Sequence, residues 1–337
     1  MVQARAWCRV DLAGGTLDIW PLGLLVPGAR TVSVAVDLPV TVKVTDQPGS
    51  ERGYVVELLD AAGERLHRSN AASAEELVQR PETALVGVVA GALSLPAAQI
   101  EVRSASPRGG GLGASSAMAV ALIAAMEAAR GLPASSVAGR AAMARDLEAQ
   151  LMRLPTGTQD HYAALLGGVI ELSYPPGGVE VQRLPVDEQL LAGSLLVAYT
   201  GQSHFSAGNN WQVIRRFLDG DLAMLGHFQG IAESAAALRH ALASGDLPAV
   251  GRCMSREWSF RRQLAPQVST PQLETQLAAA IDAGAWGGKA CGAGGGGCIA
   301  VLGPPEAREV IAKALVAAGA AVLPAAPTFQ ALEVSSS

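Results

Sequence analysis

The sequence has few lysines, few aromatic residues and little charge. Lys43, Lys289 and Lys313 are its only lysines, and 16% of its 337 residues are charged, with a net charge of −5. A nucleic-acid-binding surface needs a basic stripe, so this balance argues against a nucleic-acid partner. Because half of the residues are hydrophobic, the chain can bury a large core, and its length favours two domains.

Paired cysteines and long apolar segments are also missing. Cys8, Cys253, Cys291 and Cys298 form no Cys-x-x-Cys pair, so we expect free thiols in a reducing compartment. The N-terminus lacks the basic start and apolar core of a signal peptide. The longest apolar stretch, residues 116–129, is too short to span a bilayer. These features predict a cytoplasmic protein with no membrane partner.

The pattern of short β-branched runs changes to long alanine-rich helices at residue 115. We expect residues 60–80 to form a turn and a surface helix, with Ser135 capping the second of two long helices. A domain boundary near residue 190 separates 1–190 from 191–337. The predicted strands are 6–10, 31–36, 40–45, 54–58, 100–103, 168–172, 179–184, 195–199, 289–291, 298–302 and 321–323, and the predicted helices are 115–130, 135–154, much of 206–283, and 305–318.

The most informative stretch is a glycine turn between a strand and a buried helix. Such a turn presents unpaired N–H groups and the positive end of a helix dipole, which suits a phosphate chain. With so few lysines, backbone groups and a metal would have to neutralise much of any polyphosphate charge. The candidate nucleotide-binding residues are Pro107, Gly109, Gly110, Gly111, Leu112, Gly113, Ala114, Ser115 and Ser116.

Three other interpretations of this turn compete with phosphate binding, and the first of them fails. No Gly-Lys-Ser/Thr follows, so it is not a Walker loop. Gly109-x-Gly111-x-x-Ala114 fits the loose dinucleotide pattern, which leaves a nicotinamide-dependent oxidoreductase as an alternative, although two helices follow where a second strand is needed. A helix N-terminus with a purely structural role is the third.

Residues 107–117 resemble the Pro-x-x-x-Gly-Leu-Gly-Ser-Ser-Ala signature of the GHMP kinases. Ala114 stands where many members have Ser or Thr. The resemblance implies that the turn binds ATP and that Ser116, the second serine, is a Mg²⁺ ligand. The sequence does not define the adenine pocket, for which the strand at Tyr54 and residues 60–80 are candidates.

Two further motifs follow the order of that superfamily. Arg9-Val-Asp-Leu-Ala-Gly-Gly-Thr-Leu-Asp18 is similar to the first motif of its sugar-kinase branch. The resemblance implies that Asp18 binds sugar hydroxyls, with Gly15 and Thr16 beside it, and that Arg9 lies near the transferring phosphoryl group. Leu17 replaces the usual threonine. Residues 289–300 resemble the third, glycine-rich motif, and we expect Gly294–Gly297 to form a structural turn packed against the active site.

Two carboxylates are candidates for the chemistry. By position alone, Glu148 would be a solvated helix residue and Asp160 a helix N-cap. Residues 155–168, however, resemble the Gly-x-x-Asp-Gln stretch of sugar-type GHMP kinases. This implies that Asp160 is the catalytic base and that Glu148 and Ser116 hold Mg²⁺. His161 stands where glutamine is common.

The segment 200–211 follows a strand and borders the substrate cleft in sugar-type members, which makes Asn210, with Asn209 and Trp211, a candidate substrate contact. A hydrolase built on Ser203 and His204 is rejected, because neighbouring residues at a strand end point apart. A second set of polar residues could bind a substrate phosphate, but a solvated helix face is the favoured interpretation for Arg256, Arg261 and Arg262.

The resemblance implies an α+β, two-domain GHMP kinase fold. The N-terminal domain would carry a left-handed βαβ unit, an exception to the usual handedness, and the C-terminal domain would be ferredoxin-like. It also implies ATP and Mg²⁺, and a small-molecule sugar or sugar phosphate as acceptor, phosphorylated at the anomeric hydroxyl as in the heptose 7-phosphate kinase branch. Fucokinase-like or galactokinase-like activity, or a non-catalytic sugar sensor, are the alternatives, and a homodimer stays open.

Overall fold

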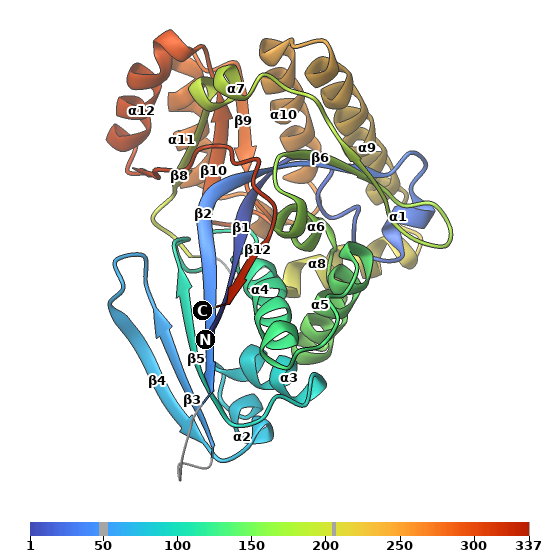
Figure 1. Ribbon diagram of the computed structural model, residues 1–337. Helices are drawn as coiled ribbons and strands as arrows, with labels where there is room; N and C mark the ends of the chain where they lie inside the picture. The colour runs from blue at the N-terminus through green and yellow to red at the C-terminus, as the bar shows by residue number, and fades with distance from the viewer. Residues whose placement is uncertain (47–52, 204–206, 337) are drawn as a thin grey trace.

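The computed structural model describes residues 1–46, 53–203 and 207–336, with no side chains described for 207–209 (Figure 1). Its larger sheet has the strand order β12-β1-β2-β5-β3-β4, with β6 added beside β2 and β7 beside β6. Within this sheet, β3 runs parallel to β5 and the other described pairs are antiparallel. Its strands are β1 (Val2–Ala13), β2 (Arg30–Asp46), β3 (Tyr54–Leu59), β4 (Arg65–Ala71), β5 (Ala98–Ser104), β6 (Val169–Ser173), β7 (Glu180–Arg183) and β12 (Glu333–Ser336).

The smaller sheet is antiparallel and has the order β11-β8-β10-β9. It consists of β8 (Leu195–Tyr199), β9 (Gly287–Ala290), β10 (Cys298–Leu302) and β11 (Ala321–Val322). Numbered by their sequence, these strands lie in the order 4-1-3-2, with helices between the first two and between the last two. This is the ferredoxin-like arrangement that the sequence led us to expect.

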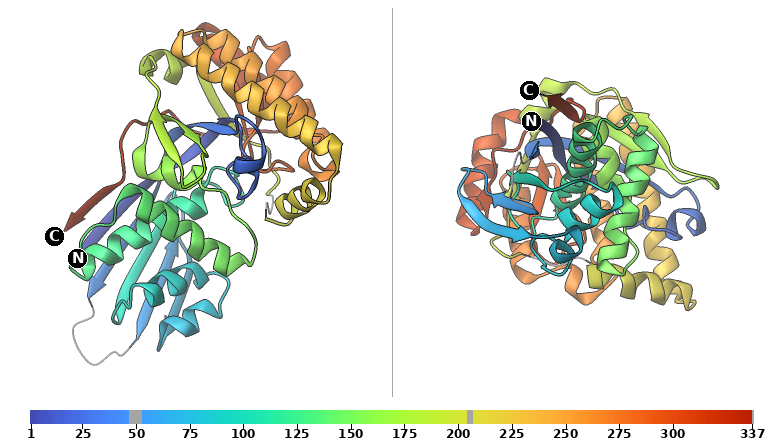
Figure 2. Two further views of the ribbon diagram at one scale, coloured as in Figure 1. Left: turned by 90° about the vertical axis from the view of Figure 1, so that its right-hand side faces the viewer. Right: turned by 60° about the horizontal axis from the view of Figure 1, so that its bottom comes forward.

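Helices cover both sheets. In the larger sheet α4 packs on β1 and β2 with α5 and α6 beside it; α10 and α11 pack on β9 and β10 of the smaller one (Figures 1 and 2). The helices are α1 (Leu22–Leu25), α2 (Ala74–Val78), α3 (Ala84–Ala92), α4 (Ala114–Ala129), α5 (Val137–Met152), α6 (Gln159–Leu166), α7 (Glu188–Ser194), α8 (Ala207–Leu218), α9 (Leu222–Ala243), α10 (Leu247–Arg261), α11 (Pro271–Asp282) and α12 (Arg308–Ala317), with 3₁₀ turns at Pro266–Val268 and Pro305–Ala307.

The two strands expected at 31–36 and 40–45 are one 17-residue strand, β2. Asp37 and Leu38 are the residues that suggested a break. In the structure they form an irregularity, because Trp7 pairs with Pro39 while its neighbour Cys8 pairs with Val36. Pro39 has no N–H to donate, but its carbonyl accepts from the N–H of Ala105 at 3.0 Å. The strand therefore bends without ending, and it can pair with β1, β5 and β6 along its length.

The expectation for residues 60–80 is wrong in part. The turn at Asp60 is present, since its carboxylate accepts from the N–H groups of Ala62 and Glu64, each at 2.9 Å. A strand, β4, follows it instead of a helix, because these residues can pair antiparallel with β3. The helix α2 is short and begins only at Ala74, where Ser73 caps it by accepting from the N–H of Glu76.

The second long helix begins one residue later than predicted. Ser136, not Ser135, is the N-cap of α5 and accepts from the N–H of Gly139 at 3.1 Å. Ser135 instead donates its hydroxyl to the buried carboxylate of Glu127, which also pairs with Arg140 at 2.5 Å. Adjacent serines are both good caps, so tertiary contacts decided between them.

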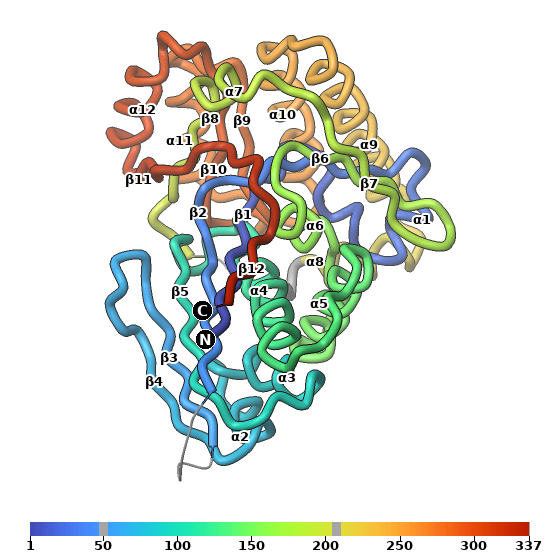
Figure 3. Tube along the Cα trace, in the orientation of Figure 1, coloured from blue at the N-terminus to red at the C-terminus, as the bar shows by residue number. Residues whose placement is uncertain are grey.

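The last described strand returns to the first sheet. β12 pairs antiparallel with β1, with Val2 opposite Ser336, and the two ends of the chain lie next to each other (Figure 3). The boundary proposed near residue 190 therefore separates the strands of the two sheets except for β12, which the sequence analysis missed. β12 is exposed and carries no apolar alternation strong enough to predict a strand.

The segment after β1 packs with the second half of the chain. Leu17, Ile19, Leu22 and Val26 belong to a buried cluster whose other members come mainly from α8 to α12 and the smaller sheet. The loop that carries Asp18 is thus anchored by its apolar side chains to the C-terminal elements. None of the helices in the described part of the chain combines the length and the hydropathy needed to cross a bilayer.

We predict that Gly287→Ala destabilises the protein by about 1–3 kcal/mol or more, because its new methyl group would lie 1.8 Å from the Gly251 carbonyl oxygen where β9 crosses α10. Gly226→Ala is the matched control. Nothing lies within 4 Å of its methyl position in the interior of α9, so it should stabilise by roughly 0.5–1 kcal/mol. Thermal unfolding of both variants measures the difference, and equal effects would contradict this account of the packing.

Candidate active site

The glycine turn lies between the end of β5 and the start of α4. Gly109, Gly111 and Gly113 have φ values of 64°, 70° and 73°, a left-handed conformation in which a side chain would be strained. Gly113 is the N-cap of α4 and no side chain caps the helix. Its first turn contains no acidic residue of its own, so negative charge at the positive end of the helix dipole has to come from other elements or from a ligand. Gly109 and Ser115 are exposed, which leaves the turn accessible to an anion.

The second glycine run, between β9 and β10, packs against this turn. The N–H of Cys298 donates to the Gly110 carbonyl at 2.8 Å, and a methyl group on Gly111 would lie 2.6 Å from the carbonyl oxygen of Cys291. A methyl group on Gly297 would lie 2.9 Å from the carbonyl oxygens of both Gly109 and Gly110. The backbones of the two glycine runs are in direct contact here, and only glycine leaves room for that contact. The expectation of a structural turn packed against the site is therefore confirmed.

Arg9 connects three distant parts of the chain. Its Nε donates to Asp160 Oδ1 at 2.7 Å, and one terminal nitrogen lies 2.6 Å from the same oxygen. The other terminal nitrogen donates to the Gly111 carbonyl at 2.7 Å. Arg9 is 4% exposed, so these bonds form where water does not compete.

Asp160 faces the glycine turn. A methyl group on Gly113 would lie 3.0 Å from Asp160 Oδ2, so this carboxylate borders the start of α4. Its side chain is 24% exposed, the most open of the acids in this cluster. Asp160 is not the N-cap of α6, as position alone suggested, because the helix already begins at Gln159. The structure thus brings a partly open carboxylate to the turn.

Asp18 is buried and bonds to the backbone just before Asp160. Its Oδ2 accepts from the N–H groups of Thr158 at 2.7 Å and Gln159 at 3.0 Å. A methyl group on Gly157 would lie 2.0 Å from the same oxygen, so the chain must be glycine there. Burial, and then the charge of Asp160, raise the pKa of Asp18 to about 6. The two carboxylates therefore belong to one electrostatic unit.

Glu148 is at the centre of a second cluster, at the first residues of α4. It is 4% exposed, which overturns the solvated position expected from its helix alone. Its two oxygens accept from the hydroxyls of Ser115 at 2.6 Å and Ser116 at 2.8 Å, and His161 Nε2 lies 2.6 Å from Oε2. Burial favours its neutral form, but these hydrogen bonds and the His161 charge lower the pKa of Glu148 on balance.

The pair Ser116 and Glu148 fits a magnesium ion. A hydroxyl and an ionised carboxylate are hard oxygen ligands, and Mg²⁺ is usually held by one or two such groups together with waters and phosphate oxygens. Across the described ranges, no three His, Cys, Asp or Glu side chains gather as a protein-only metal cage. The donor set therefore suits a cation that shares its shell with phosphate oxygens.

A buried group of four charges was missed by the sequence analysis. Lys289 Nζ lies 3.0 Å from Asp11 Oδ2 and 3.1 Å from Glu257 Oε2, and Arg261 pairs with Glu257 and lies 3.4 Å from Asp11. All four side chains are at most 2% exposed. The solvated position expected for Arg261 is therefore wrong, whereas Arg256 and Arg262 do form exposed pairs, with Glu233 and Glu274.

Arg261 also holds the loop that leads to Asp18. It donates to the Gly15 carbonyl at 2.7 Å and to the Thr16 hydroxyl at 3.1 Å. Gly15 and Thr16, assigned to the substrate from sequence, thus have their polar groups engaged by the protein, and Thr16 has a left-handed φ of 76°. Two signals could have indicated the cluster: an aspartate within the apolar run 10–13, and a lysine within a predicted strand.

The remaining site residues expected from the sequence lie in the glycine turn, on α8 or outside the described residues. Pro107, Leu112 and Ala114 complete the glycine turn, and the Leu112 carbonyl accepts from the N–H of Arg9 at 2.9 Å. Asn210 lies on α8, and no hydrogen bond among the described residues joins it to Asp18, Asp160 or the turn. Asn209 has no described side chain, and His204 lies outside the described residues. All four cysteines are free, and Cys8, Cys291 and Cys298 are buried.

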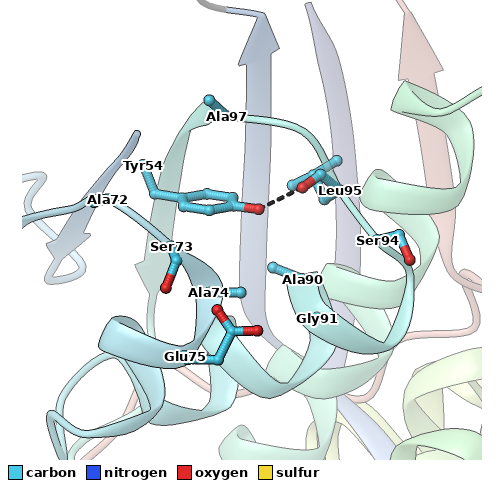
Figure 4. A pocket seen from close by; sticks show the side chains of 10 residues that line it. All are labelled: Tyr54, Ala72, Ser73, Ala74, Glu75, Ala90, Gly91, Ser94, Leu95 and Ala97. Atoms are coloured by element: carbon cyan, nitrogen blue, oxygen red, sulfur yellow. Dashed lines mark hydrogen bonds between the residues drawn. The ribbon is translucent and has the colours of Figure 1, made fainter. Parts of the chain in front are cut away.

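A pocket of about 350 Å³ lies beside Tyr54, at the far end of the sheet from this site. Tyr54 extends across it and donates its hydroxyl to the Leu95 carbonyl (Figure 4). Leu95 precedes β5 and the glycine turn follows it, so the strand, about 20 Å long at 3.3 Å per residue, separates the two. Tyr54 is therefore not beside the glycine turn. The Asp60–Glu64 turn is at the nearer end, since Leu59 pairs with Arg103.

The dinucleotide interpretation of the glycine turn fails on topology. A dinucleotide site needs a parallel strand after the helix, next to the strand that enters the turn. Here α4 is followed by α5 and α6, and the next strand, β6, pairs antiparallel with β2. The second Gly-x-Gly-x-x-Gly connects the antiparallel strands β9 and β10. Neither glycine run opens a dinucleotide-binding unit in the described fold.

Comparison with known proteins gives the same family as the motifs. The GHMP kinases N terminal domain matches residues 76–168, and the GHMP kinases C terminal domain matches residues 238–321. Together these matches cover more than half of the chain, in the expected order. The chain belongs to the GHMP kinases.

Curated relatives are similar at low identity. A bifunctional fucokinase/GDP-fucose pyrophosphorylase of Arabidopsis thaliana is 26% identical over 87% of this chain and 29% of its own length. A D-glycero-alpha-D-manno-heptose 7-phosphate kinase of Campylobacter jejuni is 27% identical over 62% of each chain. A mevalonate kinase of Thermococcus onnurineus is 30% identical over 65% of this chain and 64% of its own. The matches thus span less than two thirds of these relatives.

Solved structures share the fold over the whole chain. A D-glycero-D-manno-heptose 1-phosphate kinase of Bacteriodes thetaiotaomicron has a TM-score of 0.76 at 22% identity, covering 100% of this chain and 99% of the other. A galactokinase of Lactococcus lactis, complexed with galactose, has a TM-score of 0.72 at 13% identity, covering 98% and 95%. At these identities the likeness establishes the two-domain fold.

We predict that Lys289→Met lowers the free energy of unfolding by about 3–5 kcal/mol, because it removes the cation that pairs directly with both buried carboxylates, Asp11 and Glu257. Lys313→Met is the control. Lys313 is 75% exposed and pairs with Glu309 four residues earlier on α12, so its loss should cost about 0.5 kcal/mol or less. Denaturant unfolding measures both, and a small effect of Lys289→Met would contradict the role of the cluster.

We also predict a pH-dependent gain from Asp18→Asn. The raised pKa of Asp18 means that the folded protein keeps a proton that the unfolded chain releases, so the wild type loses stability as pH rises from about 4 to about 6. Asn cannot ionise and still accepts from the two N–H groups. Its stability relative to the wild type should therefore rise by about 3 kcal/mol over this range and stay constant above it. A difference independent of pH in denaturant unfolding would contradict the assignment.

Proposed function

We propose that this protein is an ATP-dependent kinase that phosphorylates a hydroxyl of a sugar or sugar phosphate, most closely in the manner of a heptose 7-phosphate kinase. The observation that carries this proposal is the Asp160 carboxylate, which Arg9 holds beside the start of α4 while it stays partly open. A phosphate chain at the glycine turn and a hydroxyl at Asp160 would be adjacent. Phosphoryl transfer needs that juxtaposition more than it needs covalent chemistry.

The donor side consists of the glycine turn and the Ser116–Glu148 pair. The free N–H groups at the start of α4 would bind phosphate oxygens of ATP. Ser116 and Glu148 would hold Mg²⁺, which when bound neutralises charge on the phosphates. Ser115 and His161 hydrogen-bond the Glu148 carboxylate and so fix its orientation. Arg9, tied to Gly111, keeps the turn against the acceptor side.

The acceptor side consists of Asp160 and Asp18. Asp160 accepts the proton of the attacking hydroxyl, and the guanidinium of Arg9 stabilises the carboxylate in the orientation needed. Asp18 accepts hydrogen bonds from other hydroxyls of the sugar, and Gly15, Thr16 and Asn210 are the further substrate candidates. The names of the heptose-kinase and fucokinase relatives support a sugar acceptor. The choice of the anomeric hydroxyl rests on the resemblance of the sequence motifs to the heptose-kinase branch.

A sugar 1-kinase of the fucokinase type is the second candidate. The fucokinase relative matches the largest share of this chain among the three curated relatives, 87%. The two candidates differ in the acceptor, a 6-deoxysugar in one case and a phosphorylated heptose in the other. In both cases Asp160 would accept the proton of the attacking hydroxyl.

We predict that Asp160→Asn lowers kcat by about 10²–10⁴, the usual cost of losing a general base. Activity is measured as Mg²⁺-dependent ATP consumption with a panel of aldoses, 6-deoxysugars and heptose phosphates. The fold should persist, because Asn can still accept from Arg9. Asp282→Asn, an exposed residue on α11, is the control and should keep wild-type kcat. Full activity of Asp160→Asn, or a wild type that turns over none of the panel, would refute the proposal.

A further inference from the structure

A second pocket, of about 550 Å³, opens next to Asp18 and is not used by the chemistry described above. It lies between the loop after β1 and the end of α5. The residues that line it are Trp20, Arg145, Ala149, Arg153, Leu154, Pro155 and Thr156.

This pocket adjoins the acceptor side of the site. Trp20 follows Asp18 by two residues, a separation of at most about 7 Å along the chain. On the opposite wall, Thr156 precedes Gly157, which contacts Asp18 directly. The same two chain segments that meet at Asp18 thus diverge to form the pocket. The pocket is thus lined by residues that neighbour, in the sequence, those that meet at Asp18.

One wall of the pocket is an exposed aromatic ring. Trp20 is 72% exposed, although the neighbouring Leu17, Ile19 and Leu22 are buried in the C-terminal core. The Trp20 ring is therefore presented to solvent although Ile19 beside it is buried; Leu24 and Leu25, further along the same segment, are exposed as well. A flat apolar ring with a polar N–H suits a ligand that has one apolar face and polar edges, as a sugar ring does.

The opposite wall is cationic. Arg145 and Arg153 both line the pocket, and none of its described lining residues is acidic. Arg145 bonds to the adjacent Asp146 through two of its nitrogens, at 2.7 and 2.9 Å. Arg153 has no hydrogen bond or ion pair with any part of the chain that the structure describes.

Arg153 does not serve as an ordinary cap for its helix. An arginine after a helix often donates to the last carbonyl groups, but no such bond is present here. Its backbone is left-handed, with a φ of 55°, where glycine would be the unstrained choice. Keeping an arginine at this position, unpaired and beside a pocket, has no structural benefit that the fold reveals.

We propose that this pocket binds the distal phosphate of a phosphorylated sugar, with Trp20 against the ring and Arg145 and Arg153 on the phosphate. The inference rests on the proposed function and narrows its acceptor to a sugar phosphate. Guanidinium groups match the geometry of a phosphate with paired N–H donors, which an uncharged hydroxymethyl end would leave unused. The reacting hydroxyl would then be at Asp160 and the phosphate at the opposite end of the sugar.

The test compares one sugar with and without its phosphate. The acceptors are D-glycero-D-manno-heptose 7-phosphate and the free heptose, and the variants are Arg153→Gln and Arg145→Gln/Arg153→Gln. Each lost guanidinium should raise KM for the phosphate ester about tenfold or more. KM for the free heptose, KM for ATP and kcat should change less than about twofold, because Asp160 and the turn are untouched.

Arg252→Gln is the matched control, since Arg252 is also exposed and forms no described side-chain bond, but lies on α10. It should leave all constants unchanged. Equal KM changes for the ester and the free sugar would overturn the inference, as would no change for the ester.

A binding experiment without ATP separates this inference from the kinase proposal. Calorimetric titration with heptose 7-phosphate should give a Kd at least about tenfold lower than inorganic phosphate or free heptose, and Trp20→Ala and the double arginine variant should abolish that advantage. If the ester binds in this way but no sugar is phosphorylated, the kinase proposal fails and the pocket assignment stands. If free sugars are phosphorylated and the ester has no advantage, the pocket assignment fails and the kinase stands.

Discussion

The site depends on one buried guanidinium. Arg9, on the first strand, donates both to Asp160 on α6 and to the Gly111 carbonyl in the glycine turn, so residues 151 and 102 positions away are held against each other. The turn alone is an anion site and Asp160 alone is a helix residue. To act on one substrate, the turn and Asp160 must be held in a fixed relative position. The Arg9 guanidinium does this because it is planar and has several donors in fixed directions, which a lysine lacks. Burial strengthens these bonds, because water is excluded.

The second constraint is the group of four buried charges that joins the two halves of the chain. Asp11 comes from β1, Glu257 and Arg261 from α10, and Lys289 from β9. Burying charges is costly unless each has a partner, so the group adds little net stability but disfavours any other docking of these elements. Arg261 also donates hydrogen bonds to Gly15 and Thr16, and so fixes the position of the loop that carries Asp18. The loop that carries Asp18 is thus positioned from the C-terminal elements, whereas Arg9 of the N-terminal sheet holds Asp160 and the glycine turn.

The sequence predicted those features that depend on local order along the chain. The strand, glycine turn and helix at residues 98–129 follow from motif and spacing. The pairing of Ser116 with Glu148 was implied by the family resemblance, and the structure brings the two side chains to 2.8 Å. The features that the sequence did not predict depend on contacts between residues far apart in the chain. β12 forms a strand because it can pair with β1, and β4 because it can pair with β3. Arg261 is buried because it forms ion pairs with Asp11 and Glu257. From the sequence alone, a helix face rich in arginine is interpreted as exposed to solvent, because the acidic partners are not known.

The most direct test of the central claim is a crystal structure with Mg²⁺ and a non-hydrolysable ATP analogue. The account predicts that the terminal phosphate lies between the N–H groups at the start of α4 and the Asp160 carboxylate, with the cation bound to Ser116 and Glu148. A nucleotide bound away from the glycine turn, or a terminal phosphate separated from Asp160 by the width of a helix, would contradict it.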